Sequence, residues 1–200
     1  DASDLVVCWG ADLHATNVHV WAKVEHARKR GVKLVVIDPR RTRAAANADL
    51  YLPIRIGTDS ALALGVMHIL VRDGLADRAY LAQHTLGFER VEAEILPRFT
   101  PAYVAEVTGL AVADIESFAA WYGAAKRSFL RIGFGMSRFT HGGQNLRTVA
   151  LLPGVTGAYG RWGGGALCAT ASAFGLNYGA VRKPSGPAQA RTVNHLKLGE

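Results

Sequence analysis

Two apolar stretches decide the fold: LVVCW at residues 5–9, followed by the turn GADLHAT at 10–16, and LVVID at residues 34–38. Each is a short run rich in β-branched residues that ends in a polar or glycine-containing turn, as a buried parallel strand does. The amphipathic segment between them, residues 18–31, is typical of a helix with a glycine stop. Strand, helix and strand within about 35 residues have the size of one βαβ unit.

The remaining sequence continues the alternation of strands and helices. Pro153 is expected to shorten or kink the last helix, and the glycine- and alanine-rich sequence beyond Gly157 predicts no regular structure. The predicted class is therefore α/β, a parallel sheet flanked by helices, with a helical insertion and a glycine-rich C-terminal segment. The further elements are a short helix within 40–47, a strand over 50–56, a helix from Thr58 or Asp59 to Gly74, amphipathic helices from Asp77 that include a start at Pro101, a strand over 129–132 and a helix over 145–156.

Composition narrows the class of ligand. Half of the 200 residues are hydrophobic and a fifth are charged, as in a folded domain without a disordered tract. The net charge of +7 suits an anionic partner, and the scattered lysines and arginines favour a small anion over a nucleic acid. No uninterrupted apolar run is long enough to enter a membrane. The chain begins without methionine and enters a strand at once, which suggests that an upstream part of the polypeptide is absent.

Cysteine and histidine patterns predict no metal site and no catalytic residue in this chain. Cys8 and Cys168 lack zinc or iron–sulfur spacing and are expected to be buried thiols. They neither support nor exclude a disulfide, so the sequence does not decide the compartment. The seven histidines do not cluster and are expected to be structural. No nucleophile elbow is present, so hydrolase chemistry has no support.

The turns after the predicted strands are the candidate binding sites, because open α/β sheets bind ligands at the carboxyl ends of their strands. They are Trp9–Thr16, Asp38–Thr42, Gly57–Asp59 and Gly133–Arg138. The first lacks GxGxxG spacing, so Gly10 either punctuates a turn or brings backbone N–H groups to a phosphate.

Charged residues in two of these turns suit a nucleotide. Asp38 is placed to accept hydrogen bonds from ribose hydroxyls, and Arg40 and Arg41 to bind phosphate or a base carbonyl. The carboxylate of Asp59 can accept hydrogen bonds from N1–H and the exocyclic amine of guanine. Helix capping stays open as the alternative for both acids, with Arg40 and Arg41 then simply solvated.

A series of motifs places the chain beside a known family. In chain order they are WGAD at 9–12, IDPRRT at 37–42, AD at 48–49, GTD at 57–59, HTLGF at 84–88, GFGMSRFTHGG at 133–143 and TGAYGRWGGG at 156–165. With this series the chain closely resembles the molybdopterin-guanine-dinucleotide-binding region of the dimethyl sulfoxide reductase superfamily, which includes formate dehydrogenases and nitrate reductases.

The resemblance implies a Rossmann-like α/β domain over residues 1–160 and an irregular glycine-rich continuation over 161–200 toward the next domain of a parent enzyme. The implied ligand is one guanosine diphosphate arm of a bis(molybdopterin guanine dinucleotide) cofactor that carries molybdenum or tungsten. The implied contacts are Trp9, Gly10, Ala11 and Asp12 in the first loop, Asp38, Pro39, Arg40, Arg41 and Thr42 in the second, Gly57, Thr58 and Asp59 in the third, and Phe134, Ser137 and Arg138 nearest the pterin.

In this family the residue that binds the metal, and the iron–sulfur cysteines where present, lie upstream of the matching segment. The resemblance therefore implies an oxidoreductase in the full-length parent and an inactive isolated chain. The implied partners are the remaining parent domains and an electron-transfer subunit. Two alternatives stay open: an NAD(P)-dependent dehydrogenase with Arg41 on a 2′-phosphate beside Asp38, and a non-catalytic nucleotide-binding module.

Overall fold

The structure is a computed structural model that describes residues 2–168, 175, 177 and 179. Contacts divide the chain into two units, Asp1–Ala169 and Thr170–Glu200. Most of the predicted continuation over 161–200 lies outside the described residues, and its boundary stays a prediction.

The described part of the first unit contains a sheet of five parallel strands in the order β3-β2-β1-β4-β5. The predicted α/β class with a parallel sheet is confirmed. The pairing of β1 with both neighbours runs in register along the whole strand, from Leu5 opposite Lys33 and Ser128 to Trp9 opposite Ile37 and Ile132. The strands are β1 (Leu5–Trp9), β2 (Lys33–Ile37), β3 (Leu50–Leu52), β4 (Ser128–Ile132) and β5 (Gly165–Leu167).

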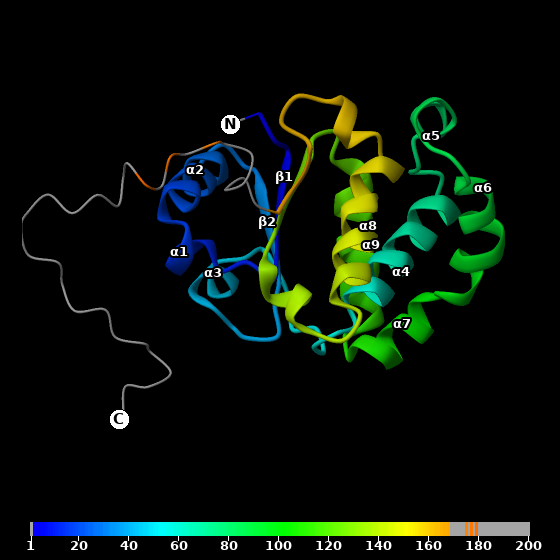
Figure 1. Ribbon diagram of the computed structural model, residues 1–200, viewed down its shortest axis with the longest axis horizontal. Helices are drawn as coiled ribbons and strands as arrows, with labels where there is room; N and C mark the ends of the chain where they lie inside the picture. The colour runs from blue at the N-terminus through cyan, green and yellow to red at the C-terminus, as the bar shows by residue number, and fades with distance from the viewer. Residues whose placement is uncertain (1, 169–174, 176, 178, 180–200) are drawn as a thin grey trace, which may run out of the picture. The chain divides into compact units, whose positions relative to one another are not determined.

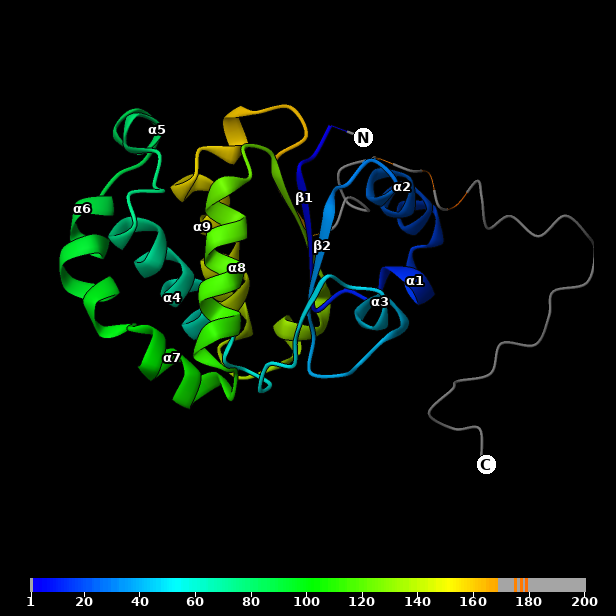
Figure 2. The same cartoon turned by 180° about the vertical axis from the view of Figure 1, so that it is seen from behind.

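Helices cover both faces of this sheet. Figures 1 and 2 show α1, α2 and α3 on one side of β1 and β2, and α4, α8 and α9 on the other, with α5, α6 and α7 farther out. The helices are α1 (Leu13–Thr16), α2 (Val18–Arg28), α3 (Arg43–Ala46), α4 (Asp59–Arg72), α5 (Arg78–His84), α6 (Phe88–Arg90), α7 (Pro101–Thr108), α8 (Val112–Ala124) and α9 (Gly142–Val155). A π-helical turn, η1 (Val91–Ile95), and three 3₁₀ turns, η2 (Leu96–Arg98), η3 (Phe134–Arg138) and η4 (Ala158–Gly160), complete the described helical elements.

The strand order explains why the helices divide between the faces. The chain steps from β1 outward to β3, and then returns past β1 to β4 and β5 on its other side. Crossovers between parallel strands are right-handed, so reversing the direction of travel moves the connecting helices to the opposite face. The reversal point lies between β1 and β4, where open α/β sheets form their ligand crevice.

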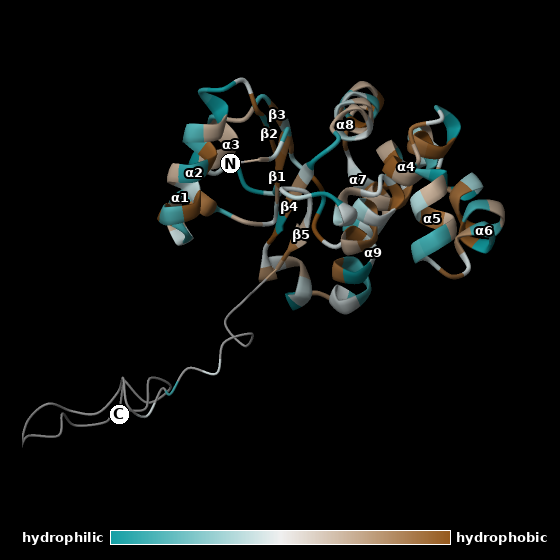
Figure 3. Cartoon of the chain, turned by 90° about the horizontal axis from the view of Figure 1, so that it is seen from above, coloured by the Kyte–Doolittle hydropathy of each residue, from teal (hydrophilic) through white to brown (hydrophobic). Residues whose placement is uncertain are grey.

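Alternation along the central strand builds two cores. Leu5, Val7 and Trp9 belong to a large cluster with residues of α4, α8 and α9. Val6 and Cys8 point to the other side and join a smaller cluster with residues of α1, α2 and α3. Because both faces are covered, the strand is apolar throughout, and Figure 3 shows hydrophobic colour along the sheet between the two helical layers.

Four details differ from the prediction. The third strand ends at Leu52 and not at residue 56, because Pro53 has no backbone N–H to donate to the ladder. The last helix begins at Gly142, earlier than expected, and contains Pro153 within it. The strand β5 forms in the glycine-rich stretch where no regular structure was predicted. Cys8 is buried as expected, but Cys168 is half-buried, so the prediction of two buried thiols was wrong for Cys168.

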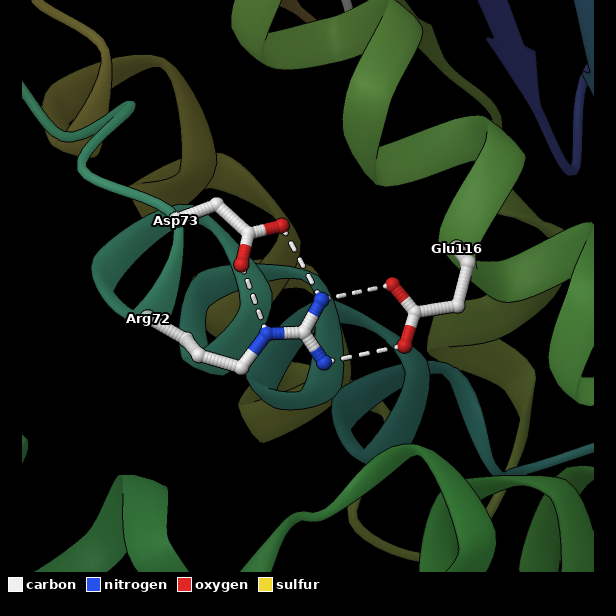
Figure 4. A network of polar contacts seen from close by, with 3 residues as sticks. All are labelled: Arg72, Asp73 and Glu116. Atoms are coloured by element: carbon white, nitrogen blue, oxygen red, sulfur yellow. Dashed lines mark hydrogen bonds and ion pairs between the residues drawn. The ribbon is translucent and has the colours of Figure 1, made fainter.

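An arginine joins the carboxyl end of α4 to α8. The Arg72 guanidinium donates to Asp73 through Nε (2.7 Å) and Nη2 (2.9 Å), and to Glu116 through Nη1 (2.9 Å) and Nη2 (2.8 Å), as Figure 4 shows. Hydrogen bonds from Arg72 hold the pKa of Asp73 below its usual range. All three side chains remain partly exposed, 43% for Arg72, 41% for Asp73 and 34% for Glu116. Water therefore screens the network.

Replacing Arg72 by alanine is expected to lower the free energy of local unfolding of α4 and α8 by no more than about 1 kcal/mol, because exposed ion pairs contribute little. The contribution should be present above the ordinary Asp73 pKa of 3.8 and be lost as the pH falls through the lower folded value. Hydrogen exchange of peptides from the two helices measures this. Arg90→Ala, which removes a more exposed pair with Glu94, is the control and should change less. A loss of several kcal/mol from Arg72→Ala would contradict the weak role.

Candidate functional site

Two glycines form the junction between the loops that follow β1 and β4. The backbone N–H of Gly133 donates to the Trp9 carbonyl (2.8 Å), and Gly10 donates to the Ile37 carbonyl (2.8 Å). A Cβ on Gly133 would lie 1.7 Å from the carbonyl oxygen of Gly10, so no side chain fits there. Gly10 itself has a φ of +61°, which favours glycine. The two loops therefore meet backbone to backbone at the reversal point of the sheet.

A cavity of about 230 Å³ opens beside this junction. It lies below the range of about 300–1,000 Å³ typical of complete small-molecule sites, so it suits part of a larger ligand. Five of its lining residues come from the predicted set: Gly10, Asp38, Pro39, Gly57 and Asp59. The others are Ile37, Ile54, Ile56, Gly135 and Met136. Loops that follow four strands thus meet at one place, as the sequence predicted.

Asp59 is the buried charge of this cavity, with 6% of its surface exposed. Its Oδ1 accepts a hydrogen bond from Nε1 of Trp9 (2.8 Å). Burial raises the pKa of Asp59 above its usual range, the Trp9 hydrogen bond opposes that rise, and the charge of Asp38 adds to it. The hydrogen bond to Trp9 crosses from α4 to β1, so Asp59 does more than cap its own helix.

Asp38 directly follows β2, and Asp12 lies in the loop after β1, at the start of α1. Asp38 Oδ1 accepts from the backbone N–H of Arg40 (2.9 Å) and shapes the second turn. Burial raises the pKa of Asp38, while Arg40 lowers it. Asp12 Oδ2 accepts from the Arg40 guanidinium (3.3 Å), and its buried Oδ1 has no hydrogen-bond partner among the described residues. A buried acceptor without a donor is suited to a hydroxyl or amine of a ligand.

The loop that carries Asp59 is held from the far side by Asn145, a buried residue of α9. The Asn145 Oδ1 accepts from the backbone N–H of Ser60 (3.2 Å) and from its hydroxyl (2.5 Å), and Nδ2 donates to the Gly57 carbonyl (3.4 Å). Gly57 has a φ of +84°, and a Cβ there would lie 2.6 Å from the Phe139 ring. The backbone on both sides of Asp59 is therefore fixed.

The other predicted contacts divide into structural and free residues. The Thr42 hydroxyl accepts from Ala45 N and caps α3, and the Thr58 hydroxyl donates to the Arg55 carbonyl. Ten residues of the predicted set do not line the cavity. Among the described residues, the side chains of Arg41 and Arg138 are exposed and make no hydrogen bond or ion pair. The set that lies outside the cavity lining is Trp9, Ala11, Asp12, Arg40, Arg41, Thr42, Thr58, Phe134, Ser137 and Arg138.

The sequence did not predict the apolar residues that line the cavity or the hydrogen bonds by which Asn145 holds the Gly57–Ser60 loop. Ile54 and Ile56 were assigned to a strand, although their alternation past Pro53 marks an extended segment that borders the site. Met136 and Gly135 lie between predicted contacts of the same loop, so the loop was found and its lining residues were not. Nothing in the local pattern distinguishes Asn145 from other polar helix positions.

A larger hollow of about 950 Å³ lies elsewhere on the first unit. Its walls include Ala2 and Ser3, which precede β1, together with Phe129 near the start of β4. It contains none of the predicted site residues. Because ligands of open α/β sheets bind at the carboxyl ends of strands, the smaller cavity is the better candidate.

Among residues 2–168, 175, 177 and 179, no three histidine, cysteine, aspartate or glutamate side chains come together as a metal site. Over the same residues, no helix has the length and apolarity needed to span a membrane.

The sequence matches one protein family and several of its relatives. A family model described as molybdopterin oxidoreductase matches residues 1–199. Probable oxidoreductase YoaE from Bacillus subtilis is 39% identical over 90% of the chain and 26% of its own length. The F420-dependent formate dehydrogenase subunit alpha of Methanocaldococcus jannaschii is 31% identical over 82% of the chain and 24% of its own length. The chain thus spans about a quarter of the length of these relatives.

One solved structure has a similar fold. Acetylene hydratase from Pelobacter acetylenicus superposes with a TM-score of 0.72 and 28% sequence identity, over 78% of this chain and 22% of that one. The similarity extends through most of the first unit, so the two chains share this fold.

Proposed function

This chain belongs to the molybdopterin oxidoreductase family, and from that premise we propose that its carboxyl-end cavity holds one guanosine diphosphate arm of a bis(molybdopterin guanine dinucleotide) cofactor. The cofactor, carrying molybdenum or tungsten, supplies the oxidation–reduction chemistry when bound, and the protein binds and orients it. The work of this chain is then recognition of a nucleotide.

The observation that carries the proposal is the buried carboxylate of Asp59 in a cavity of about 230 Å³. A carboxylate only accepts hydrogen bonds, and it costs free energy to bury without donors. Guanine presents two adjacent donors, N1–H and the 2-amino group, whereas adenine has an acceptor at N1. The buried apolar side chains of Ile54 and Met136 supply the dry walls that make such a contact selective.

Glycines of the cavity lining, and two exposed arginines that follow lining residues in the sequence, support a diphosphate at this site. Gly10, Gly57 and Gly135 line the cavity without side chains, so a ligand can approach the backbone closely. Arg41 and Arg138 are exposed, and among the described residues they have no acidic partner. Guanidinium groups bind phosphate oxygens through paired hydrogen bonds. We expect the phosphates at these arginines and the ribose near Asp38 and Asp12.

The activity of the full-length protein follows as a second part of the proposal. Proteins similar to this chain are named for formate and for acetylene, which differ in chemistry. A shared nucleotide-binding fold therefore leaves substrate choice to residues around the metal, outside this chain. We propose an oxidoreductase whose catalytic residues, and an iron–sulfur cluster if it has one, lie in other parts of the polypeptide. The relative named as subunit alpha supports a partner subunit, and we propose that this partner transfers electrons.

The test is the composition of the purified full-length protein. Molybdenum and tungsten are measured together with the nucleotides released by acid hydrolysis. The proposal expects about two guanosine monophosphates per metal, since a bis-dinucleotide cofactor carries two arms. A protein matured in a host that makes the cofactor, yet containing neither metal nor guanosine nucleotide, would contradict it. Bound nicotinamide dinucleotide would instead support the dehydrogenase alternative with Asp38 and Arg41.

A further inference from the structure

Trp9 sits behind the cavity and not in it. Its side chain is fully buried, and it belongs to the large core that includes residues of α4 and α8. The ring meets Phe118 edge to face, with centroids 6.1 Å apart and an interplanar angle of 70°. Core packing on one side and the β1 backbone on the other fix the indole. A ligand in the cavity cannot touch a side chain with no exposed surface, so Trp9 acts through its neighbours.

The indole N–H has one acceptor, and that acceptor lines the cavity. A buried indole needs a hydrogen-bond partner, and Asp59 Oδ1 provides it at 2.8 Å across 50 residues of sequence. Among the described residues no other side chain donates to Asp59. The carboxylate is thus attached at one oxygen to a rigid core group, while its residue borders the cavity.

The backbone of the same loop is fixed independently. Asn145 bonds to Gly57 before Asp59 and to Ser60 after it. A carboxylate on a fixed backbone still rotates about its side-chain bonds, and the Trp9 hydrogen bond removes that freedom. The two contacts leave Asp59 with one orientation before any ligand arrives, which lowers the cost of binding.

We propose that Trp9 is a positioning residue for base recognition, in which its indole N–H holds Oδ1 of Asp59 and so presents the carboxylate to the paired donors of a guanine. This inference rests on the proposed function, because it deepens the role given to Asp59. Trp9 contributes selectivity without touching the ligand.

The test removes the donor and keeps the aromatic body. The full-length protein with Trp9→Phe is prepared without molybdopterin cofactor, and its affinities for GDP and ADP are compared with those of the wild type. Affinity for GDP should fall by about tenfold, while affinity for ADP, which makes no use of the carboxylate, stays the same. Trp21→Phe in α2 is the matched control, and it should leave the ratio of GDP affinity to ADP affinity unchanged.

A pH profile separates positioning from a packing defect. The Trp9 hydrogen bond lowers the pKa of Asp59, so its loss should raise the pH at which GDP affinity declines on acidification. Asp38, which accepts from Arg40, is the neighbouring acid that acts on Asp59, and it is unchanged in the variant. If the phenylalanine variant fails to fold, site-specific 3-benzothienylalanine keeps the bicyclic ring and removes the N–H.

The outcomes distinguish the inference from the function on which it rests. Asp59→Ala should abolish the preference for GDP. If it does so while Trp9→Phe keeps the wild-type ratio and pH profile, the positioning role is overturned and the proposed function stands. If Asp59→Ala keeps the preference, or if the wild type binds neither nucleotide, the proposed function itself fails. A lowered ratio with a shifted profile in Trp9→Phe supports the inference.

Discussion

Asp59→Asn is expected to convert a preference for guanine into a preference for xanthine. The carboxylate offers two acceptors, which match N1–H and the 2-amino group of guanine, whereas an amide offers one acceptor and one donor. Xanthine presents N1–H beside a carbonyl oxygen and so matches the amide. The Trp9 N–H, 2.8 Å from Oδ1, keeps an acceptor in the variant. GDP affinity should fall by about 10- to 100-fold, and XDP should become the preferred nucleotide.

Equilibrium binding of GDP, XDP and ADP to the full-length protein without cofactor measures this exchange. Arg41→Ala provides the contrast, because a lost phosphate contact should weaken all three nucleotides alike. Arg98→Ala, an exposed arginine in η2 away from the cavity, should change none of them. Unaltered GDP and XDP affinities in the asparagine variant would show that Asp59 does not contact the base.

Gly133→Ala is expected to have the largest effect on stability. The added Cβ would lie 1.7 Å from the Gly10 carbonyl oxygen and 2.5 Å from its carbon. The backbone at Gly133, with φ −93° and ψ 159°, would accept alanine, so the conflict is steric. The loops must separate, which breaks the hydrogen bond from Gly133 to Trp9. We expect a loss of about 3 kcal/mol and a loss of GDP binding.

Gly154→Ala is the matched control for this substitution. Gly154 lies within α9, and a Cβ there would meet nothing within 4 Å. Alanine should stabilise the helix by about 0.5–1 kcal/mol. Hydrogen exchange of peptides that cover β1 and β4 in the full-length protein compares the two variants. Unchanged protection of those strands in Gly133→Ala would show that the junction tolerates a side chain.

Local periodicity was sufficient to predict four of the five strands in the described residues, and the edge of the sheet where the candidate site lies. LVVCW and LVVID are apolar throughout because helices cover both faces of β1 and β2, and each ends where a polar loop begins. Asp59 was singled out because a carboxylate follows a glycine at the start of a helix. Each of these features depends on a few consecutive residues, so it can be predicted without knowing which residues pack together in the fold.

The contacts that hold the candidate site join residues that are far apart in the sequence. Trp9 and Asp59 are 50 residues apart, and Asn145 is 85 residues from Ser60. An indole in an apolar strand has the pattern of an ordinary core residue, and an asparagine in a helix has that of a surface residue. β5 was missed for another reason, because Gly165–Leu167 is too short and too rich in small residues to show a period.

The position of β1 governs when this site can exist during synthesis. β1 lies at the centre of the sheet, yet its neighbour β4 begins at Ser128, and the helices from α4 to α8 are made between them. The cavity needs residues from Gly10 to Met136, so it closes only after Met136 has left the ribosome. A ligand that bridges those loops stabilises the native state alone, by mass action. The nucleotide would then bind only after the long-range pairing of β1 with β4, and its binding would stabilise that pairing.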